Sequence, residues 1–125
     1  MNIQEFEAMW LKKFVPHLTK EQYDDCYVDQ YLWHVFSFEM IPKTAVLTGD
    51  AARKAYEAAD KDGAIMLRLW DVSDDVHTER MTEQYKQVEL LDEMPETYVV
   101  GKDWEWTYVS THENGWCGPY FYRGG

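Results

Sequence analysis

The chain has 125 residues, of which 46% are hydrophobic and 16% aromatic, and its formal net charge at pH 7 is −11. This length is typical of one domain, and the apolar content is enough for a core, which excludes an intrinsically disordered chain. The negative charge repels nucleic-acid phosphates and anionic lipids, so it argues against nucleic acids and membranes as partners and favours a basic protein.

The N-terminal residues predict an amphipathic helix. Apolar side chains recur at helical spacing over residues 3–14, and Pro16 ends the pattern. The stripe consists of Ile3, Phe6, Met9, Trp10 and Phe14. Because Glu5 and Glu7 interrupt any apolar run, the segment is neither a secretory signal nor a membrane span, and we expect a cytoplasmic protein.

The next stretch predicts a short helix and then a strand. Thr19 and Gln22 have the spacing of a capping box, so we expect a helix over residues 20–27. The sequence "YLWHVFSF", residues 31–38, is rich in aromatic and β-branched side chains, which favours a buried strand.

A second helix and another strand follow. In "GDAARKAYEAADKDG" Asp50 can cap a helix over residues 51–60, five alanines raise its propensity, and Gly63 can end it. The run "AIMLRLW", residues 64–70, is apolar and has the length of a strand.

Residues 71–96 are the most acidic part of the chain, with nine acidic residues against two basic ones. We expect a loop over residues 71–78, whereas residues 81–94 are also compatible with a helix. Since loops with this much charge stay at the surface, the segment predicts an exposed acidic rim formed by Asp71, Asp74, Asp75 and Glu79. The rim is either a docking surface for a basic partner or a solvated face without one.

The C-terminal residues predict a β-hairpin that follows a strand at residues 97–101. Asn114-Gly115 is the dipeptide favoured in a two-residue type I′ turn, and a longer loop over residues 113–118 is the alternative. The tight turn pairs Val109 with Tyr120, and Tyr108 with Phe121. Because Pro119 cannot donate a hydrogen bond, we expect the last strand to lie at the edge of the sheet.

In this register His112 lies opposite Cys117, which makes the two residues candidates for catalysis. Alternation places them on one core-facing side of the hairpin, together with Trp104, Trp106, Tyr108 and Ser110. A thiol beside an imidazolium can become a nucleophile, but Glu113 points to the opposite face and cannot orient the histidine. Three alternatives remain open: a packed, hydrogen-bonded pair, a ligand contact and a catalytic pair.

The sequence predicts neither a metal nor a cofactor. The histidines, His17, His34, His77 and His112, are scattered, and HExxH and paired CxxC motifs are absent from the chain. Cys26 and Cys117 are expected to remain reduced thiols, as in most cytosolic proteins.

Together these elements predict an α+β fold. We expect a single compact domain over residues 1–125, with a mixed, largely antiparallel sheet, a C-terminal β-hairpin, and helices at residues 3–14 and 51–60 packed on one face of the sheet.

Four stretches, "LWHVFSF", "LTGDAARKAY", "WEWTYVSTHE" and "CGPYFY", resemble a family of small bacterial proteins known as domain of unknown function 4275. The resemblance covers residues 31–122. It implies a compact bacterial single-domain protein and carries over no activity and no site residues.

The function that these patterns favour is that of a non-enzymatic, acidic binding protein of the immunity or inhibitor type, which neutralises a basic enzyme. Clustered carboxylates beside aromatic residues combine electrostatic steering with anchor side chains. A small enzyme using Cys117 and His112 is the alternative, and solubility alone is another explanation of the charge.

Overall fold

The computed structural model describes residues 3–28, 31–68, 79–80, 87–88, 91, 97–111 and 118–124. Their centre is a six-stranded sheet with the order β1-β6-β5-β4-β2-β3, in which every pair of neighbours is antiparallel. The strands are β1 (Val46–Thr48), β2 (Ile65–Arg68), β3 (Glu79–Arg80), β4 (Thr97–Val100), β5 (Trp106–Ser110) and β6 (Tyr120–Arg123). With the helices described below, the chain has the predicted α+β fold.

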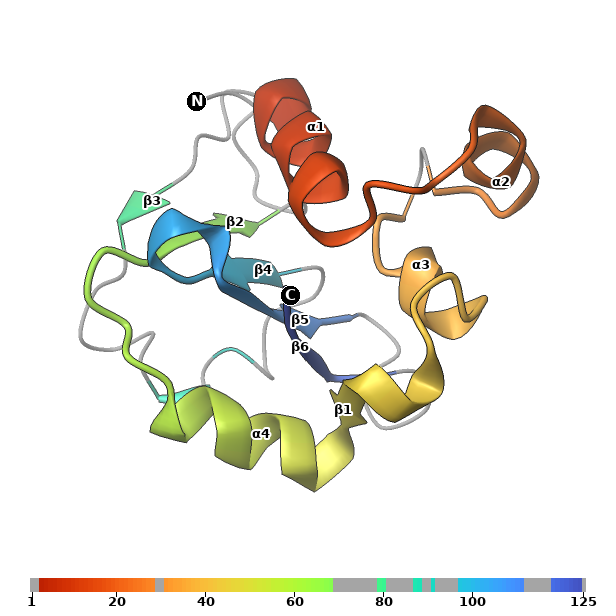
Figure 1. The fold of residues 1–125 in the computed structure, drawn as a ribbon. Helices are drawn as coiled ribbons and strands as arrows, with labels where there is room; N and C mark the ends of the chain where they lie inside the picture. Colours follow the sequence, from red (N-terminus) through yellow and green to blue (C-terminus); the bar gives the residue numbers. More distant parts are fainter. Residues whose placement is uncertain are drawn as a thin grey trace.

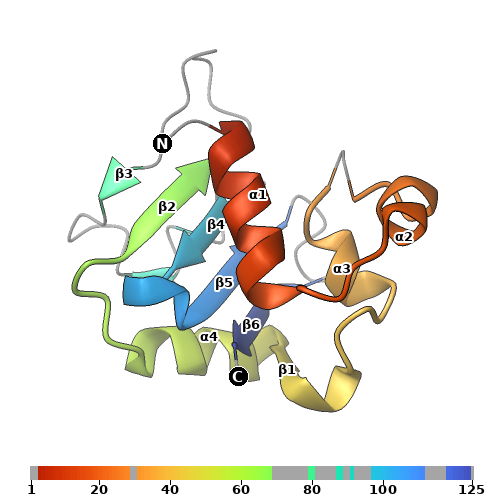
Figure 2. The ribbon, with the colours of Figure 1, turned by 45° about the horizontal axis from the view of Figure 1, so that its top comes forward.

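The two long helices cover opposite faces of the sheet. Helix α1 (Ile3–Phe14) packs on one face and α4 (Gly49–Ala58) on the other, as Figures 1 and 2 show. The prediction that both lie on one face is wrong. The physical reason is that β5 is buried along its whole length. Its apolar side chains point to both faces of the sheet, so each face must be covered by a helix.

The face under α1 holds the larger core. Trp10 is completely buried and makes edge-on contacts with Phe36 and Tyr98, with ring centroids 5.8 and 6.0 Å apart. Its Nε1–H donates to Thr107 Oγ1 at 3.0 Å, and that hydroxyl donates to the Val99 carbonyl at 2.9 Å. This chain of hydrogen bonds satisfies the buried indole and fixes α1 against β4 and β5.

The face under α4 is a second aromatic core. Tyr56 is buried against Tyr108, with ring centroids 4.7 Å apart, and Trp106 stacks on Phe121 at 5.5 Å. Helix α4 begins after Thr48 instead of being capped by Asp50, whose carboxylate accepts a hydrogen bond from Arg53 at 2.9 Å within the first turn. The helix also ends at Ala58, before Gly63.

The register of the C-terminal hairpin is the one that the Asn-Gly turn predicts. Val109 pairs with Tyr120, and Tyr108 with Phe121. The predicted edge position of the last strand is wrong, because β1 pairs with β6 on its other side. Proline is tolerated because it precedes β6, whose pairs with β1 and β5 begin at Tyr120, so neither ladder needs its N–H; its carbonyl accepts the Gly49 N–H at 3.2 Å.

Residue 104 also departs from the prediction. It lies in the 3-10 helix η3 (Lys102–Trp104), and its ring packs on Phe6 of α1 at 5.2 Å. Trp104 therefore belongs to the α1 face, whereas Trp106 and Tyr108 lie on the α4 face. Strand alternation does not extend through the turn that precedes β5.

The segment between α1 and β1 is helical. Helix α2 (Lys20–Asp25) begins with the predicted capping box of Thr19 and Gln22. It is followed by α3 (His34–Ser37) and the 3-10 helix η1 (Lys43–Ala45). The predicted strand over residues 31–38 is therefore wrong. The segment buries Leu32, Trp33, Val35 and Phe36, a pattern of helical spacing that covers the α1 face of the sheet.

Candidate functional site

Most of the residues that the sequence singles out lie outside the described residues. These are His112, Cys117, Asp71, Asp74 and Asp75. The β5–β6 register agrees with the turn that would place His112 opposite Cys117, but the pair itself stays a prediction. Glu79 lies in β3, at the end of the sheet order, where its backbone pairs with Met66.

The described residues contain a different candidate surface, which begins at the C-terminal end of α2. There the Val28 N–H donates to the Tyr23 carbonyl at 3.1 Å, and the Tyr27 N–H reaches the Asp24 carbonyl at 3.5 Å. This is the Schellman pattern, which closes a helix with one residue in the left-handed conformation. That residue is usually glycine, but here it is Tyr27, with φ of 58°.

Helix α3 closes in the same way. The Met40 N–H donates to the Val35 carbonyl at 2.9 Å, the Glu39 N–H to the Phe36 carbonyl at 3.1 Å, and Glu39 has φ of 57°. Two consecutive helices therefore end on a left-handed residue with a side chain. A left-handed backbone costs an L-residue roughly 1–2 kcal/mol relative to the right-handed helical region.

The side chains around these two helix ends are exposed and aromatic. Tyr27 is 56% exposed and Phe38 is 52% exposed. Among the large hydrophobic residues that the structure describes, the next most exposed is Leu47, at 44%. The half-buried His34 ring has its centroid 5.0 Å from that of Tyr31 and 5.3 Å from that of Phe38. The three rings therefore form a contiguous group.

The helix that precedes the exposed tyrosine is acidic. Helix α2 carries Glu21, Asp24 and Asp25, all exposed, against a single Lys20. We call Glu21, Asp24, Asp25, Tyr27 and Phe38 the α2–α3 surface. In Figures 1 and 2, α2 projects to one side of the sheet, away from α4.

Three hydrogen bonds, of which the one to Tyr98 is buried, hold this surface on the body of the protein. The His34 Nδ1–H donates to the Cys26 carbonyl at 2.7 Å, which ties α3 to the end of α2. The Trp33 N–H donates to Tyr98 Oη of β4 at 3.2 Å, and the His17 ring is hydrogen-bonded to the Met40 carbonyl at 3.0 Å. The surface is thus exposed on its outer side and fixed from beneath.

Other kinds of site are not found in the described part of the chain. Histidine, cysteine and carboxylate side chains do not gather there in threes that could hold a metal ion. Cys26 is a free, half-buried thiol. The helices within the described ranges all lack the length and apolar character needed to cross a bilayer.

A comparison with protein families identifies the group to which the sequence belongs. The family described as Domain of unknown function (DUF4275) matches residues 3–121. The chain is a member of this family. The match confirms the resemblance and extends it to residues 3–30, which include α1 and α2. Neither the curated proteins nor the solved structures contain a significant match.

Two features of the sequence concealed the α2–α3 surface. The capping box at Thr19 predicted a helix through Tyr27, and glycine, the usual residue of a Schellman turn, does not follow α2. The aromatic composition of residues 31–38 concealed their spacing, in which the less buried Tyr31, His34 and Phe38 follow one another at intervals of three and four. That spacing was the available signal of a helix.

Proposed function

We propose that this protein is a non-enzymatic binding protein of the immunity or inhibitor type, and that its α2–α3 surface docks a basic protein partner. The observation that carries the proposal is Tyr27, an exposed aromatic residue on a left-handed backbone at the end of a helix with three exposed carboxylates. Its side chain is the anchor, and the carboxylates supply the charge that attracts the partner.

The conformation of Tyr27 supports a role in binding because folding does not favour tyrosine at this position. Glycine would complete the Schellman motif without the steric cost of a Cβ. Trp104 also has a left-handed backbone, with φ of 59°, but its ring gains packing against Phe6. Tyr27 is mostly exposed and gains no comparable burial. Backbone strain without a packing reason is typical of functional positions.

Charge complementarity favours a basic partner. The chain has a net charge of −11, and Glu21, Asp24 and Asp25 add a local excess around the aromatic anchor. Opposite charge speeds the encounter of two proteins, whereas a buried aromatic side chain at the centre of an interface supplies most of the affinity. The predicted acidic rim of Asp71, Asp74, Asp75 and Glu79 would add to the same attraction.

The proposal also concerns the compartment. In the cytoplasm glutathione and thioredoxin keep thiols reduced, which agrees with a free Cys26. We therefore propose that the protein acts there.

The experiment that tests the function is capture of the partner from an extract of the native cells at low and high salt. A specific basic protein should be retained by the wild type at low salt, and its purified form should bind with a stoichiometry of one to one. Asp24→Asn/Asp25→Asn should slow association several-fold at low ionic strength. The matched control is Glu57→Gln/Asp62→Asn, which removes two exposed carboxylates on and just after α4.

Two results would contradict the proposal. One is a partner that binds the Asp24→Asn/Asp25→Asn variant and the α4 control at the same rate. The other is rapid alkylation of Cys117 with an apparent pKa well below the free value of about 8.5, which would favour the enzyme that uses Cys117 and His112.

A further inference from the structure

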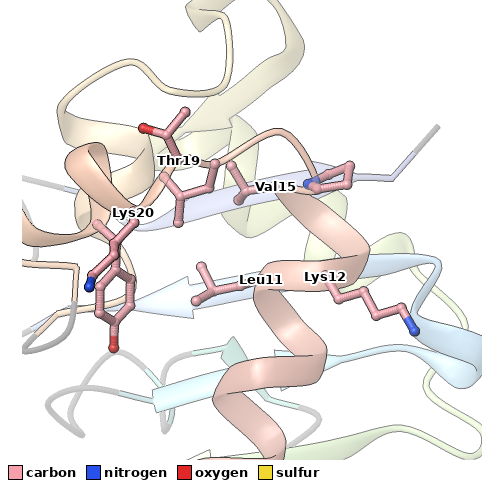
Figure 3. A pocket seen from close by; sticks show the side chains of 8 residues that line it. Leu11, Lys12, Val15, Thr19 and Lys20 are labelled. Carbon is pink, nitrogen blue, oxygen red and sulfur yellow. The ribbon is translucent and has the colours of Figure 1, made fainter.

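A groove lies between the last turns of α1 and the start of α2, apart from the α2–α3 surface. Its volume is about 470 Å³, within the size range of small-molecule sites. Figure 3 shows the side chains that line it. They are Leu11, Lys12, Val15, Pro16, Leu18, Thr19, Lys20 and Tyr23.

The middle of the groove is apolar. Val15 is buried and half-buried Leu11 and Leu18 pack against the core beneath it, so the walls are supported from below. The Thr19 hydroxyl oxygen accepts the Gln22 N–H in the capping box at 3.1 Å, which holds this side chain in place. An occupant of this part would be held mainly by apolar contact.

The ends of the groove are basic. In Figure 3, Lys12 and Lys20 extend away from each other on opposite sides of the apolar middle. Residues 8–20 contain three lysines and lack acidic residues, in a chain whose net charge is −11. The residues that line the groove do not include a carboxylate. The groove is therefore suited to an anion, which most of the surface would repel.

The two ends differ in their charge. Lys20 is followed by Glu21 and, one helical turn later, by Asp24, which reduce its local potential. Lys12 is followed by Lys13, and the residues three and four positions from it on either side are Ala8, Met9, Val15 and Pro16. Among its neighbours along the chain, Lys12 therefore has fewer carboxylates than Lys20.

From these observations we infer that the groove binds a small amphipathic anion, a medium-chain alkyl carboxylate, with its head group at Lys12 and its hydrocarbon chain along Leu11, Val15 and Leu18. This site is independent of the proposed docking of a basic protein. The free small molecule, rather than a membrane, is the occupant, since the whole molecule's charge repels an anionic bilayer.

The test is a titration of the full chain with sodium decanoate below its micelle concentration, followed by amide chemical shifts in NMR spectra. The largest shifts should occur at Leu11, Val15, Leu18 and Tyr23. Along the series acetate, hexanoate and decanoate, the affinity should rise by up to about fourfold per methylene until the apolar middle is filled. Decanol, which lacks the charge, should bind more weakly than decanoate.

Three lysine variants separate the site from net charge. Lys12→Gln should weaken decanoate binding about threefold to fivefold, in keeping with an exposed ion pair, and Lys20→Gln should have a smaller effect. Lys13→Gln is the matched control, because it removes the same charge from the neighbouring position, which does not line the groove. It should change the affinity less than about 1.5-fold.

The inference is overturned if Lys12→Gln and Lys13→Gln change the affinity equally, if decanol binds as tightly as decanoate, or if the shifts concentrate at Tyr27 and Phe38. None of these results depends on the protein partner. The groove and the proposed function therefore succeed or fail separately.

Discussion

Two aromatic stretches of this protein have similar composition and opposite roles. Strand β5, "WTYVS", is buried along its whole length and forms the centre of the sheet. Residues 31–38, "YLWHVFSF", form a turn and the short helix α3, with Leu32, Trp33, Val35 and Phe36 buried and Ser37 and Phe38 exposed. The first stretch belongs entirely to the core, whereas the second contributes to the core with one side and presents a surface with the other.

The difference shows that the arrangement of aromatic residues, and not their number, decides the structure. Every side chain of β5 is buried, because α1 packs on one face of the sheet and α4 on the other. In residues 31–38 the less buried positions, Tyr31, His34 and Phe38, recur at helical intervals. Substitutions in the two regions should therefore differ in what they change: the free energy of unfolding in the core and association at the α2–α3 surface.

The largest effect on stability is expected in the core under α1. Trp10→Ala removes a completely buried indole and leaves the Thr107 hydroxyl without its donor, so the free energy of unfolding should fall by about 3–5 kcal/mol. Urea unfolding followed by circular dichroism measures this. Trp10→Phe keeps most of the volume and should cost less. Equal costs for the two variants would show that packing does not dominate at this position.

The next effect tests the tight approach of the β4–β5 connection to the core. A Cβ added to Gly101 would lie 2.6 Å from Cε2 of the buried Trp106 ring, closer than real contacts allow. Gly101→Ala should therefore lower the free energy of unfolding by about 2–3 kcal/mol through overpacking. Gly49→Ala is a useful comparison, since a Cβ there meets open space and the cost comes from its φ of 59° alone. A Gly101→Ala protein with unchanged stability would contradict the packing described here.

At the α2–α3 surface, glycine should be better for folding than alanine. Tyr27→Gly relieves the left-handed strain, whereas Tyr27→Ala removes the ring and keeps the strain. The glycine variant should be more stable than the alanine variant by about 1 kcal/mol. Glu39→Gly and Glu39→Ala repeat the comparison at the end of α3, where the expected order is the same. If alanine equals glycine at both positions, the backbone there is not strained.

The smallest effect concerns Glu7 of α1, whose pKa is raised above the usual 4.5 by burial. A raised pKa in the folded state means that stability falls as the pH rises from 4.5 through the raised value. Glu7→Gln should therefore stabilise the protein at neutral pH, by less than about 0.5 kcal/mol, and have almost no effect at about pH 3, where the carboxyl is neutral in both states. Thermal unfolding at the two pH values tests this. A gain that persists at acid pH would point to a cause other than ionisation.

The sequence predicted the parts of the fold that depend on local signals. The helix at residues 3–14, the capping box at Thr19 and the β5–β6 register are confirmed, because signals close together in the sequence predict them. Three features depend on contacts between residues far apart in the sequence and were not predicted. They are the packing of one helix on each face of the sheet, the position of β1 beside β6, and the helical state of residues 31–38. The Tyr27 turn was missed because a side chain occupies a position where glycine is the usual signal.

The most direct test of the account is to measure partner affinity and stability on the same samples of wild type and Tyr27→Gly. The partner is the basic protein captured at low salt, in purified form. We predict that the Tyr27→Gly variant is at least as stable as the wild type and binds at least about tenfold more weakly, as expected for an aromatic anchor. A Tyr27→Gly protein that binds its partner with wild-type affinity would contradict the central claim that the α2–α3 surface is the docking site.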